Sequence, residues 1–279
     1  MTDTSARIAQ AIDARFGVQL PLPADCAGLD GLARMLEHRS HRRYSTRVVG
    51  EDLLRLLFAC AMSAPSKSDL QQADIVQVRD AALRTKIAGL VADNAWVADA
   101  PVLLVFCGNH RRTRQVAEWR GKTFANDHLD AFMNAAVDAG IVLMNFINAA
   151  EAAGLGCCPI SSVRNHSQEV SDLLGLPEWV FPLAGLGLGY PESSGVITPR
   201  LPLDVTVHTD RFSEDGIAAK IDGYDRRRAS QAPYAKQRGV KQFGEAAFYG
   251  WSEDKARQYA KPQRADFGAF IRRKQFKLD

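Results

Sequence analysis

Apolar residues recur three or four positions apart in the first part of the chain, which is the spacing of one helix face. Leu29, Leu32 and Leu36 show this spacing, and Pro65 stops a second such pattern. Elsewhere the pattern alternates or becomes a short apolar run, as in half-buried and fully buried strands. These patterns predict, in chain order, a helix over 29–39, a helix over 51–64, a strand over 73–80, a helix over 83–93 and a strand over 101–108.

The most strongly periodic segment runs from 126 to 153 and predicts a helix of about seven turns. Small residues on its apolar face would let another helix approach closely, and Gly154 provides a helix C-cap. A helix this apolar must be buried, either in a large core or against another subunit, and both alternatives stay open. Its predicted buried face consists of Leu129, Phe132, Met133, Ala136, Val137, Gly140, Ile141, Met144 and Ile147.

A short helix at 167–177 and a glycine-spaced strand at 181–191 complete the interleaved pattern. Because strands and helices interleave while helix dominates, the sequence predicts a layered α+β fold with a mixed sheet. From about Asp210 the periodicity weakens, and Arg, Lys, Gln and aromatic residues become frequent. The chain is therefore predicted to have a compact domain over 1–209 and a C-terminal extension over 210–279 that packs on the core or on a partner.

Composition narrows the possible functions. A net charge of +3 gives no electrostatic case for nucleic acid or a membrane surface, and no apolar run approaches the roughly 20 residues that span a bilayer. The five cysteines lack metal-ligand spacing, so no metal site is predicted and a reducing, cytoplasmic location is expected. The adjacent Cys157 and Cys158 leave a redox role open. No signal peptide is expected, because the first 17 residues lack an apolar core segment.

Glycine-rich stretches begin at Gly154 and Gly185, but neither has the third glycine of a dinucleotide-binding loop. Pro159 and Tyr190 stand at that position, and neither stretch joins a strand to a following helix. The sequence also lacks the patterns of a P-loop, a nucleophile elbow and a zinc protease. Because the chain shows no acid–base or nucleophile set of its own, we expect a cofactor to supply its chemistry.

The stretch HRSHRRYS, residues 38–45, gathers arginine, histidine and serine at the end of a predicted helix. A second polar stretch, SAPSKSDLQ, occupies 63–71, and the stretch TPRLP contributes Arg200. A guanidinium group binds phosphate through two bonds and serine adds a directional donor, so the set suits a phosphomonoester. A solvated helix end is the plainer interpretation of the basic stretch on its own.

Taken in order, HRSHRRYS, APSKSDLQ, the long helix with GCCPISSVRN after it, and TPRLP resemble the FMN-dependent nitroreductase family. They are most similar to its NADPH-dependent nitroreductase and flavin reductase branch. The resemblance implies a layered α+β fold whose mixed, mainly antiparallel sheet is flanked by helices. It also implies a homodimer with two FMN sites at the interface, where the helix 126–153 packs against its twin.

The resemblance assigns roles by position in this sequence. The FMN phosphate, the ribityl chain and the N1/O2 edge of the ring would be held by His38, Arg39, Ser40 and Arg42, with Arg200 completing the phosphate contacts. Other cofactor contacts would come from Ser66 and Ser68, from Asn94 of the other subunit, and from Pro159, Ile160, Ser161 and Ser162 near N5. The 2′-phosphate of NADPH would bind Arg238, with Arg226–Arg228 as alternatives.

Four positions depart from the family pattern. Asp69 stands where relatives often have Asn, which removes a donor. Ser161 and Ser162 replace a common pair of glycines, which narrows the space near N5. Thr198 stands where near relatives often carry Lys, which removes a phosphate contact. Arg42 would stabilise the anionic reduced flavin as well as bind it.

The implied reaction is a ping-pong cycle. NADPH or NADH would deliver hydride to flavin N5, and a nitroaromatic compound, a quinone or a free flavin would then take the electrons. Such a cycle requires positioning and electrostatics, so no catalytic side chain is predicted. Two alternatives stay open: a specialised flavoenzyme that acts on one metabolite by dehalogenation, dehydrogenation or flavin breakdown, and a non-catalytic flavin-binding protein. Nucleic-acid binding is disfavoured because the basic stretches lack interleaved aromatic residues.

Overall fold

A computed structural model describes residues 3–23 and 25–279, and the chain divides into two compact units. Unit 1 combines residues 1–39 with 196–263, and unit 2 combines 40–195 with 264–279. The helices of unit 1 are α1 (Asp3–Phe16), α2 (Leu29–Leu36), α8 (Leu203–Thr206), α9 (Ile217–Gln231), α10 (Val240–Phe243) and α11 (Trp251–Tyr259). The elements of unit 2 are α3 (Glu51–Met62), η1 (Lys67–Asp69), β1 (Ala73–Gln77), α4 (Ala81–Leu90), η2 (Ala92–Val97), β2 (Val102–Asn109), α5 (Arg111–Trp119), α6 (Leu129–Ala152), β3 (Gly156–Ile160), η3 (Ser161–His166), α7 (Ser167–Leu173), β4 (Val180–Gly189) and α12 (Phe267–Arg273).

A four-stranded sheet forms the centre of unit 2, with the strand order β1-β2-β4-β3. Its three ladders are antiparallel, and β2 and β4 are the central strands. All eight residues of β2 are buried, as the wholly apolar run predicts for a strand with both faces covered. The predicted α+β fold is confirmed. β1, β2 and β4 lie close to the predicted strands, whereas β3 is a strand that the sequence patterns did not predict.

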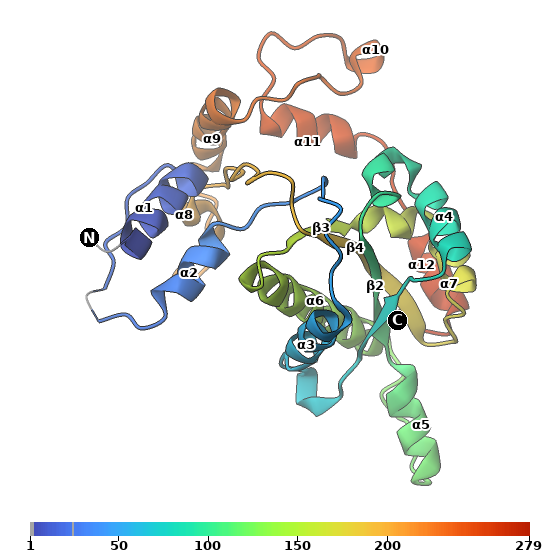
Figure 1. Ribbon diagram of the computed structural model, residues 1–279. Coiled ribbons are helices and arrows are strands. Elements are labelled where there is room, and N and C mark those ends of the chain that lie inside the picture. The colour runs from blue at the N-terminus through green and yellow to red at the C-terminus, as the bar shows by residue number, and fades with distance from the viewer. Residues whose placement is uncertain (1–2, 24) are drawn as a thin grey trace. The chain divides into compact units, whose positions relative to one another are not determined.

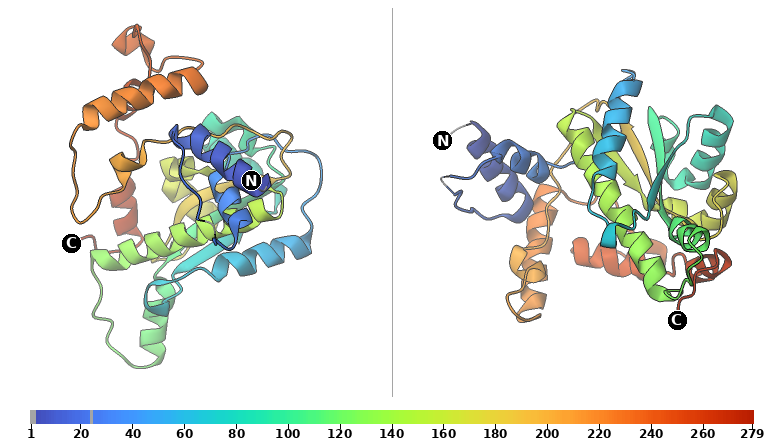
Figure 2. Two further views of the ribbon diagram at one scale, coloured as in Figure 1. Left: turned by 90° about the vertical axis from the view of Figure 1, so that its left-hand side faces the viewer. Right: turned by 90° about the horizontal axis from the view of Figure 1, so that it is seen from below.

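The two faces of the sheet carry separate cores, because successive side chains of a strand point to opposite faces. Leu104 and Phe106 of β2 pack in the core under α3 and α6, where Phe106 contacts Phe146 edge to face at 5.7 Å between ring centroids. Leu103 and Val105 pack in the core on the other face. Figures 1 and 2 show α3 and α6 side by side on one face and α4 and α7 on the opposite face.

Helix α6 buries a different face from the one its sequence predicts. The side that packs on the sheet is lined by Ala131, Ala135, Asp138, Ala139, Val142, Phe146, Ile147 and Ala150. Five residues of the predicted face are exposed instead: Leu129 (48%), Met133 (56%), Val137 (45%), Ile141 (36%) and Met144 (43%). The helix is apolar on both sides, and among the described residues it alone is long and apolar enough to cross a membrane. One such helix is weak evidence of a membrane span, since the core helix of a soluble protein passes the same test.

The basic segment that follows α2 runs along the free edge of β3. Ser40 forms a parallel bridge with Cys157, and the His41 N–H donates to the Cys157 carbonyl oxygen at 2.9 Å. The His41 ring lies against Gly156, where a Cβ would stand 2.7 Å from the ring. A glycine at the start of β3 therefore lets the segment approach the sheet closely. The Tyr44 hydroxyl then donates to the His41 carbonyl oxygen at 2.5 Å.

The last sixteen residues belong to unit 2. Phe270, Ile271 and Phe276 are buried in a cluster with Ala135 of α6 and Phe181 of β4. Figure 1 shows α12 on the same side of the sheet as α7, and α5 extending away from the sheet. The predicted division at residue 209/210 stays a prediction about the organisation of the chain, since the two compact units are both discontinuous in sequence.

Unit 1 is built from two helix pairs. α1 packs on α2 through Ile8, Ile12 and Ala33, and an ion pair between Arg7 and Glu37 (2.6 Å) reinforces the contact. α9 packs on α11, where the Tyr224 and Trp251 rings meet edge to face at 5.6 Å. Each pair lies within one of the two segments of unit 1, and the segments are joined by other contacts, such as the bond from the Arg200 N–H to the Arg15 carbonyl oxygen at 2.7 Å.

Candidate functional site

Arg42 extends from the edge segment toward β3. Burial raises the pKa of the Cys158 thiol, and the nearby charge of Arg42 opposes the shift. Burial also raises the pKa of Cys157 well above its usual value. Both residues are free thiols that stay protonated at neutral pH, so neither provides a thiolate nucleophile.

The end of β3 and the start of η3, residues 159–162, contain most of the residues predicted to lie near the flavin ring. Pro159 and Ser161 are exposed, but Ile160 is only 2% exposed and offers its backbone alone. The Asn94 side chain donates from Nδ2 to Ser162 Oγ at 3.0 Å. Asn94 thus contacts Ser162 within one chain, and its predicted contact with the flavin of the other subunit stays a prediction.

Arg264 is a residue of the same loop environment that sequence reasoning missed. Its Nε donates to Asn165 Oδ1 at 2.8 Å, and its Nη2 donates to Ser161 Oγ at 3.2 Å. A second guanidinium, that of Arg164, donates to the Leu183 carbonyl oxygen, and burial followed by the charge of Arg264 lowers its pKa. Two arginines therefore lie at this segment: Arg164, which is part of the stretch GCCPISSVRN, and Arg264, which no local motif indicates because it is about a hundred residues downstream.

A buried carboxylate organises the second polar stretch. Asp138 of α6 is 1% exposed and accepts hydrogen bonds from Ser66 Oγ (2.7 Å), from the Lys67 N–H (3.1 Å) and from the backbone and side chain of Gln72 (3.3 and 3.4 Å). Ser66 Oγ also accepts from the Gln71 N–H at 2.7 Å. Its hydroxyl proton is thus committed to Asp138, and the predicted cofactor contact of Ser66 stays a prediction.

The loop held by Asp138 has a strained backbone. Ser68, Asp69 and Gln71 have φ values of 50°, 57° and 52°, a region that non-glycine residues adopt at a cost of about 1 kcal/mol each. The loop borders a cavity of about 540 Å³ that is also lined by Asp138 and Arg112. Ser68 and Asp69 are exposed, and Asp69 lines this cavity.

His110 contacts the same network through Gln72. Its Nδ1 lies 2.6 Å from Gln72 Oε1, and its Nε2 is buried with no hydrogen-bond partner among the described residues. Burial, followed by the charge of Arg114, lowers the pKa of His110 to about 4. Asp127 and Asp130 oppose the shift and Lys67 adds to it. The ring is therefore neutral at pH 7, with its proton on Nδ1 so that it donates to Gln72.

Unit 1 brings together the remaining residues predicted to hold phosphate. His38 and Arg39 follow α2, and Arg39 Nε is buried with no hydrogen-bond partner among the described residues. Arg200 is exposed, and its Nη1 bonds only nearby carbonyl oxygens, those of Thr198 (3.3 Å) and Pro199 (3.4 Å). Arg39 Nε is thus a buried donor that could accommodate an acceptor, and the predicted phosphate contacts of these residues stay a prediction.

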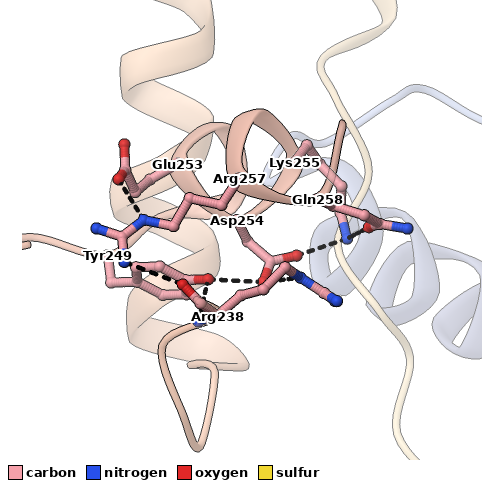
Figure 3. A network of polar contacts seen from close by, with 7 residues as sticks. All are labelled: Arg238, Tyr249, Glu253, Asp254, Lys255, Arg257 and Gln258. Carbon is pink, nitrogen blue, oxygen red and sulfur yellow. Dashed lines mark hydrogen bonds and ion pairs between the residues drawn. The ribbon is translucent and has the colours of Figure 1, made fainter. Parts of the chain in front are cut away.

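Arg238 lies in a separate polar network of unit 1, shown in Figure 3. Its Nε is 3.5 Å from Asp254 Oδ1, and its side chain is 49% exposed. Asp254 also accepts from Tyr249 (2.8 Å) and Lys255 (2.6 Å), while Arg257 donates to the Arg238 carbonyl oxygen at 3.0 Å. Arg238 is thus partly committed to an internal ion pair, and its predicted contact with NADPH stays a prediction.

Family models match nearly the whole chain beyond residue 34. The model described as "Nitroreductase family" matches residues 35–190, and the model "Nitroreductase family, C-terminal domain" matches residues 198–279.

The chain belongs to the nitroreductase family.

The resemblance stated from the motifs is therefore confirmed. The chain is 36% identical to the FMN reductase [NAD(P)H] of Bacillus subtilis (strain 168) over 194 residues, covering 68% of this chain and 78% of that protein. It is 33% identical to the NADPH-flavin oxidoreductase of Vibrio harveyi over 203 residues, covering 73% and 82%. The structure is similar to that of NfrA2 of B. megaterium, with a TM-score of 0.81 at 31% identity, covering 90% of this chain and 99% of that one.

We expect Asp138→Asn to destabilise this nitroreductase by about 2–4 kcal/mol, because the amide NH2 would replace one carboxylate oxygen, face at least one of the existing donors and remove the charge that strengthens the other bonds. Chemical denaturation measures the loss, and limited proteolysis should show earlier cleavage within 63–72. Asp130→Asn is the matched control, since Asp130 is exposed on the first turn of the same helix; its cost should stay below about 1 kcal/mol. Equal losses in the two variants would contradict the role given to Asp138.

We expect the stability of the protein to fall between pH 6.5 and pH 4, because the unfolded chain binds a proton at His110 that the folded chain refuses. The depressed folded pKa makes this contribution complete above pH 6.5 and progressively lost below it. Between pH 7 and pH 5 the loss is about 2 kcal/mol. The measurement compares unfolding free energies of the parent and His110→Asn, which cannot titrate. Identical pH dependence in both proteins would rule out the assigned pKa.

Proposed function

We propose that this chain is an FMN-dependent oxidoreductase that takes electrons from NADPH or NADH and passes them to nitroaromatic compounds, quinones or free flavins. Family membership and the names of the two reported relatives support the cofactor and the donor. The observation that carries the proposal is structural: the segment bearing Ser40 and Arg42 pairs with β3, directly beside the loop Pro159–Ser162. The exposed side chains of Ser40 and Arg42 thus border residues 159–162, a segment that needs a cofactor to supply redox chemistry.

The residues present suit FMN. A flavin mononucleotide has a phosphate, a polyhydroxyl chain and a ring with carbonyl and imine edges. Arg39 and Arg200 provide cationic donors for the phosphate and His38 provides its ring, and the buried Arg39 Nε, which has no partner among the described residues, supports an acceptor at this set. Ser40, Arg42, Ser161 and Ser162 provide donors for the chain and the ring edges. These assignments rest on the position of each residue in the sequence and on which of the residues lie in the same unit of the structure.

FMN, when bound, supplies the hydride acceptance from a nicotinamide and the electron transfer to a second substrate. The chain contributes binding, orientation and electrostatics. Arg42 places a fixed positive charge beside β3, which favours a negatively charged ring over a neutral one. Asn94 holds the Ser162 hydroxyl in place, and Asp138 holds the second loop rigid at the cavity beside it. No side chain is required to act as a nucleophile or to exchange a proton.

The exposed apolar face of α6 supports a homodimer. Leu129, Met133, Val137, Ile141 and Met144 recur four, four, four and three positions apart and so form one stripe. Leu56 and Met62 of α3, the helix packed beside α6, are also exposed, at 60% and 48%. An apolar stripe this long is covered in a stable protein, and a second copy of the chain provides a matching surface. The dimer completes the two-site arrangement expected for FMN at a subunit interface.

Three finer assignments belong to the same proposal. The protein is placed in the cytoplasm, because its cysteines, including Cys107, Cys157 and Cys158 in the core, are free thiols. NADPH is preferred as donor through cationic side chains of residues 226–238, although Asp254 already holds Arg238. Residues 210–279 act as an extension that packs on the core or a partner, with 264–279 contributing to the core of unit 2.

The test begins with colour. The purified protein should bind FMN and turn yellow, and anaerobic NADPH should bleach the oxidised flavin absorbance, with initial rates that follow a ping-pong pattern. Arg42→Gln should raise the Kd for FMN by about 10- to 100-fold, since a hydrogen bond to a charged group contributes about 1.5–3 kcal/mol.

Arg43→Gln is the matched control, because the Arg43 side chain is exposed and the structure uses its carbonyl oxygen only, in a bond from the Glu192 N–H. Its Kd should stay within about twofold of the parent. An FMN-saturated protein whose flavin neither NADPH nor NADH reduces would refute the reductase function and favour a flavin-binding role.

We expect Ile141→Glu to convert a dimer into monomers, because each interface would bury two carboxylates in an apolar contact across the symmetry axis. Light scattering coupled to size exclusion measures the mass, which should fall from twice that of one chain to once. Val48→Glu serves as control, since Val48 is 81% exposed and lies outside α6. A parent protein that is monomeric at micromolar concentration would contradict the dimer.

A further inference from the structure

Arg15 is a buried cation in the last turn of α1, a helix that precedes the part of the chain matched by the family models. The residue is only 6% exposed. Charged side chains are rarely buried this completely unless their hydrogen bonds are used. The position of Arg15 within unit 1 shows where those bonds go.

The Arg15 guanidinium joins two loops through their carbonyl oxygens. Nε donates to Leu36 O at 2.9 Å and Nη2 donates to His38 O at 2.6 Å, on the segment that leads into Arg39. Nη1 donates to Thr198 O at 3.2 Å, on the segment that leads into Arg200. The planar fork of a guanidinium can bridge carbonyls in this fixed geometry, which an ammonium group cannot reproduce.

The backbone of Arg15 adds a fourth link. Its carbonyl oxygen accepts from the Arg200 N–H at 2.7 Å. α9 holds the same segment from another side, because Tyr224 donates to Pro199 O at 3.2 Å and Arg227 donates to Arg200 O at 2.7 Å. Three successive carbonyls, those of residues 198–200, are therefore held by side chains from α1 and α9.

Gly17 permits this arrangement. It has a φ of 67°, and a Cβ there would stand 2.7 Å from the Arg227 side chain. The turn after α1 thus lets Arg227 pass close to the backbone and reach Arg200.

We propose that Arg15 is a positioning residue for the cofactor phosphate: it clamps the segment of His38 and Arg39 to the segment of Thr198 and Arg200, so that the cationic donors of both face one phosphomonoester. This inference rests on the proposed assignment of FMN phosphate to His38, Arg39 and Arg200. The N-terminal helix then serves cofactor binding, although it lies outside the family match.

The physical reason is pre-organisation. Two loops from distant parts of the chain lose freedom when they close around an anion, and a site whose backbone is already held avoids that entropy cost. The effect concerns the phosphate and not the ring, because the clamp acts only on the segments that carry the phosphate ligands. Riboflavin, which has the same ring and sugar chain but no phosphate, is therefore the discriminating probe.

The experiment measures Kd values for FMN and for riboflavin with the full-length parent protein, Arg15→Met, Arg15→Lys and the control Arg7→Gln. Arg7 lies on the same helix and pairs with Glu37, so its loss weakens the packing of α1 on α2 without touching the clamp. We expect Arg15→Met to raise the Kd for FMN by about 10- to 100-fold and that for riboflavin by less than about threefold. Arg15→Lys should lie in between, and Arg7→Gln should leave the ratio of the two Kd values unchanged.

A ratio that stays at the parent value in both Arg15 variants, or that changes equally in Arg7→Gln, overturns the inference. Should Arg15→Met fail to fold, Arg15→Lys and Arg227→Met decide, since Arg227 holds the Arg200 carbonyl from α9 and should lower the preference for FMN in the same way. A parent that binds riboflavin as tightly as FMN contradicts the phosphate assignment itself. A parent that prefers FMN while the variants keep that preference contradicts the role of Arg15 alone.

Discussion

Backbone pairing attaches residues 40–44 to the free edge of β3, and the arrangement of the candidate site depends on that attachment. The bridge between Ser40 and Cys157 and the bond from His41 to Cys157 use main-chain groups, so they set the register whatever the side chains do. His41 packs over Gly156, which leaves Ser40 and Arg42 available beside the strand. Some basic residues of this stretch, such as His41, pack against the sheet, and others, such as Arg42, stay available for a ligand. The number of basic residues alone therefore does not indicate a binding site.

The second part of the candidate site in unit 2 is the loop held by Asp138, and folding this part costs free energy. A carboxylate buried in α6, a histidine kept neutral and three residues with left-handed backbone are each unfavourable in isolation. They become tolerable together because Asp138 satisfies four donors of the loop, and His110 orients Gln72, which provides two of them. Such a network holds a loop in one conformation at a cavity, which suits a protein whose chemistry comes from a positioned cofactor.

In unit 1, the residues proposed to bind phosphate lie on two loops that are more than 150 residues apart in sequence. Side chains of α1 and α9 hold those loops by their carbonyl oxygens, which leaves the guanidinium groups of Arg39 and Arg200 free of strong internal partners among the described residues. Arg238 contrasts with them, since Asp254 already neutralises part of its charge. The difference separates cations placed for a ligand from cations that stabilise the fold.

The sequence alone determined the order of helices and strands, the buried character of β2 and the stretches that border the site, because periodicity and turn residues act over a few positions. It also carried the family resemblance through the spacing of HRSHRRYS, APSKSDLQ and TPRLP. It did not decide which side of α6 meets the sheet, because both sides are apolar and give no local sign of it. Only the tertiary structure decided that Asn94 contacts Ser162 of its own chain, that Arg264 and Asp138 support the two loops, and that Arg15 joins two distant segments. Those roles depend on contacts between residues tens to hundreds of positions apart, and no local pattern records them.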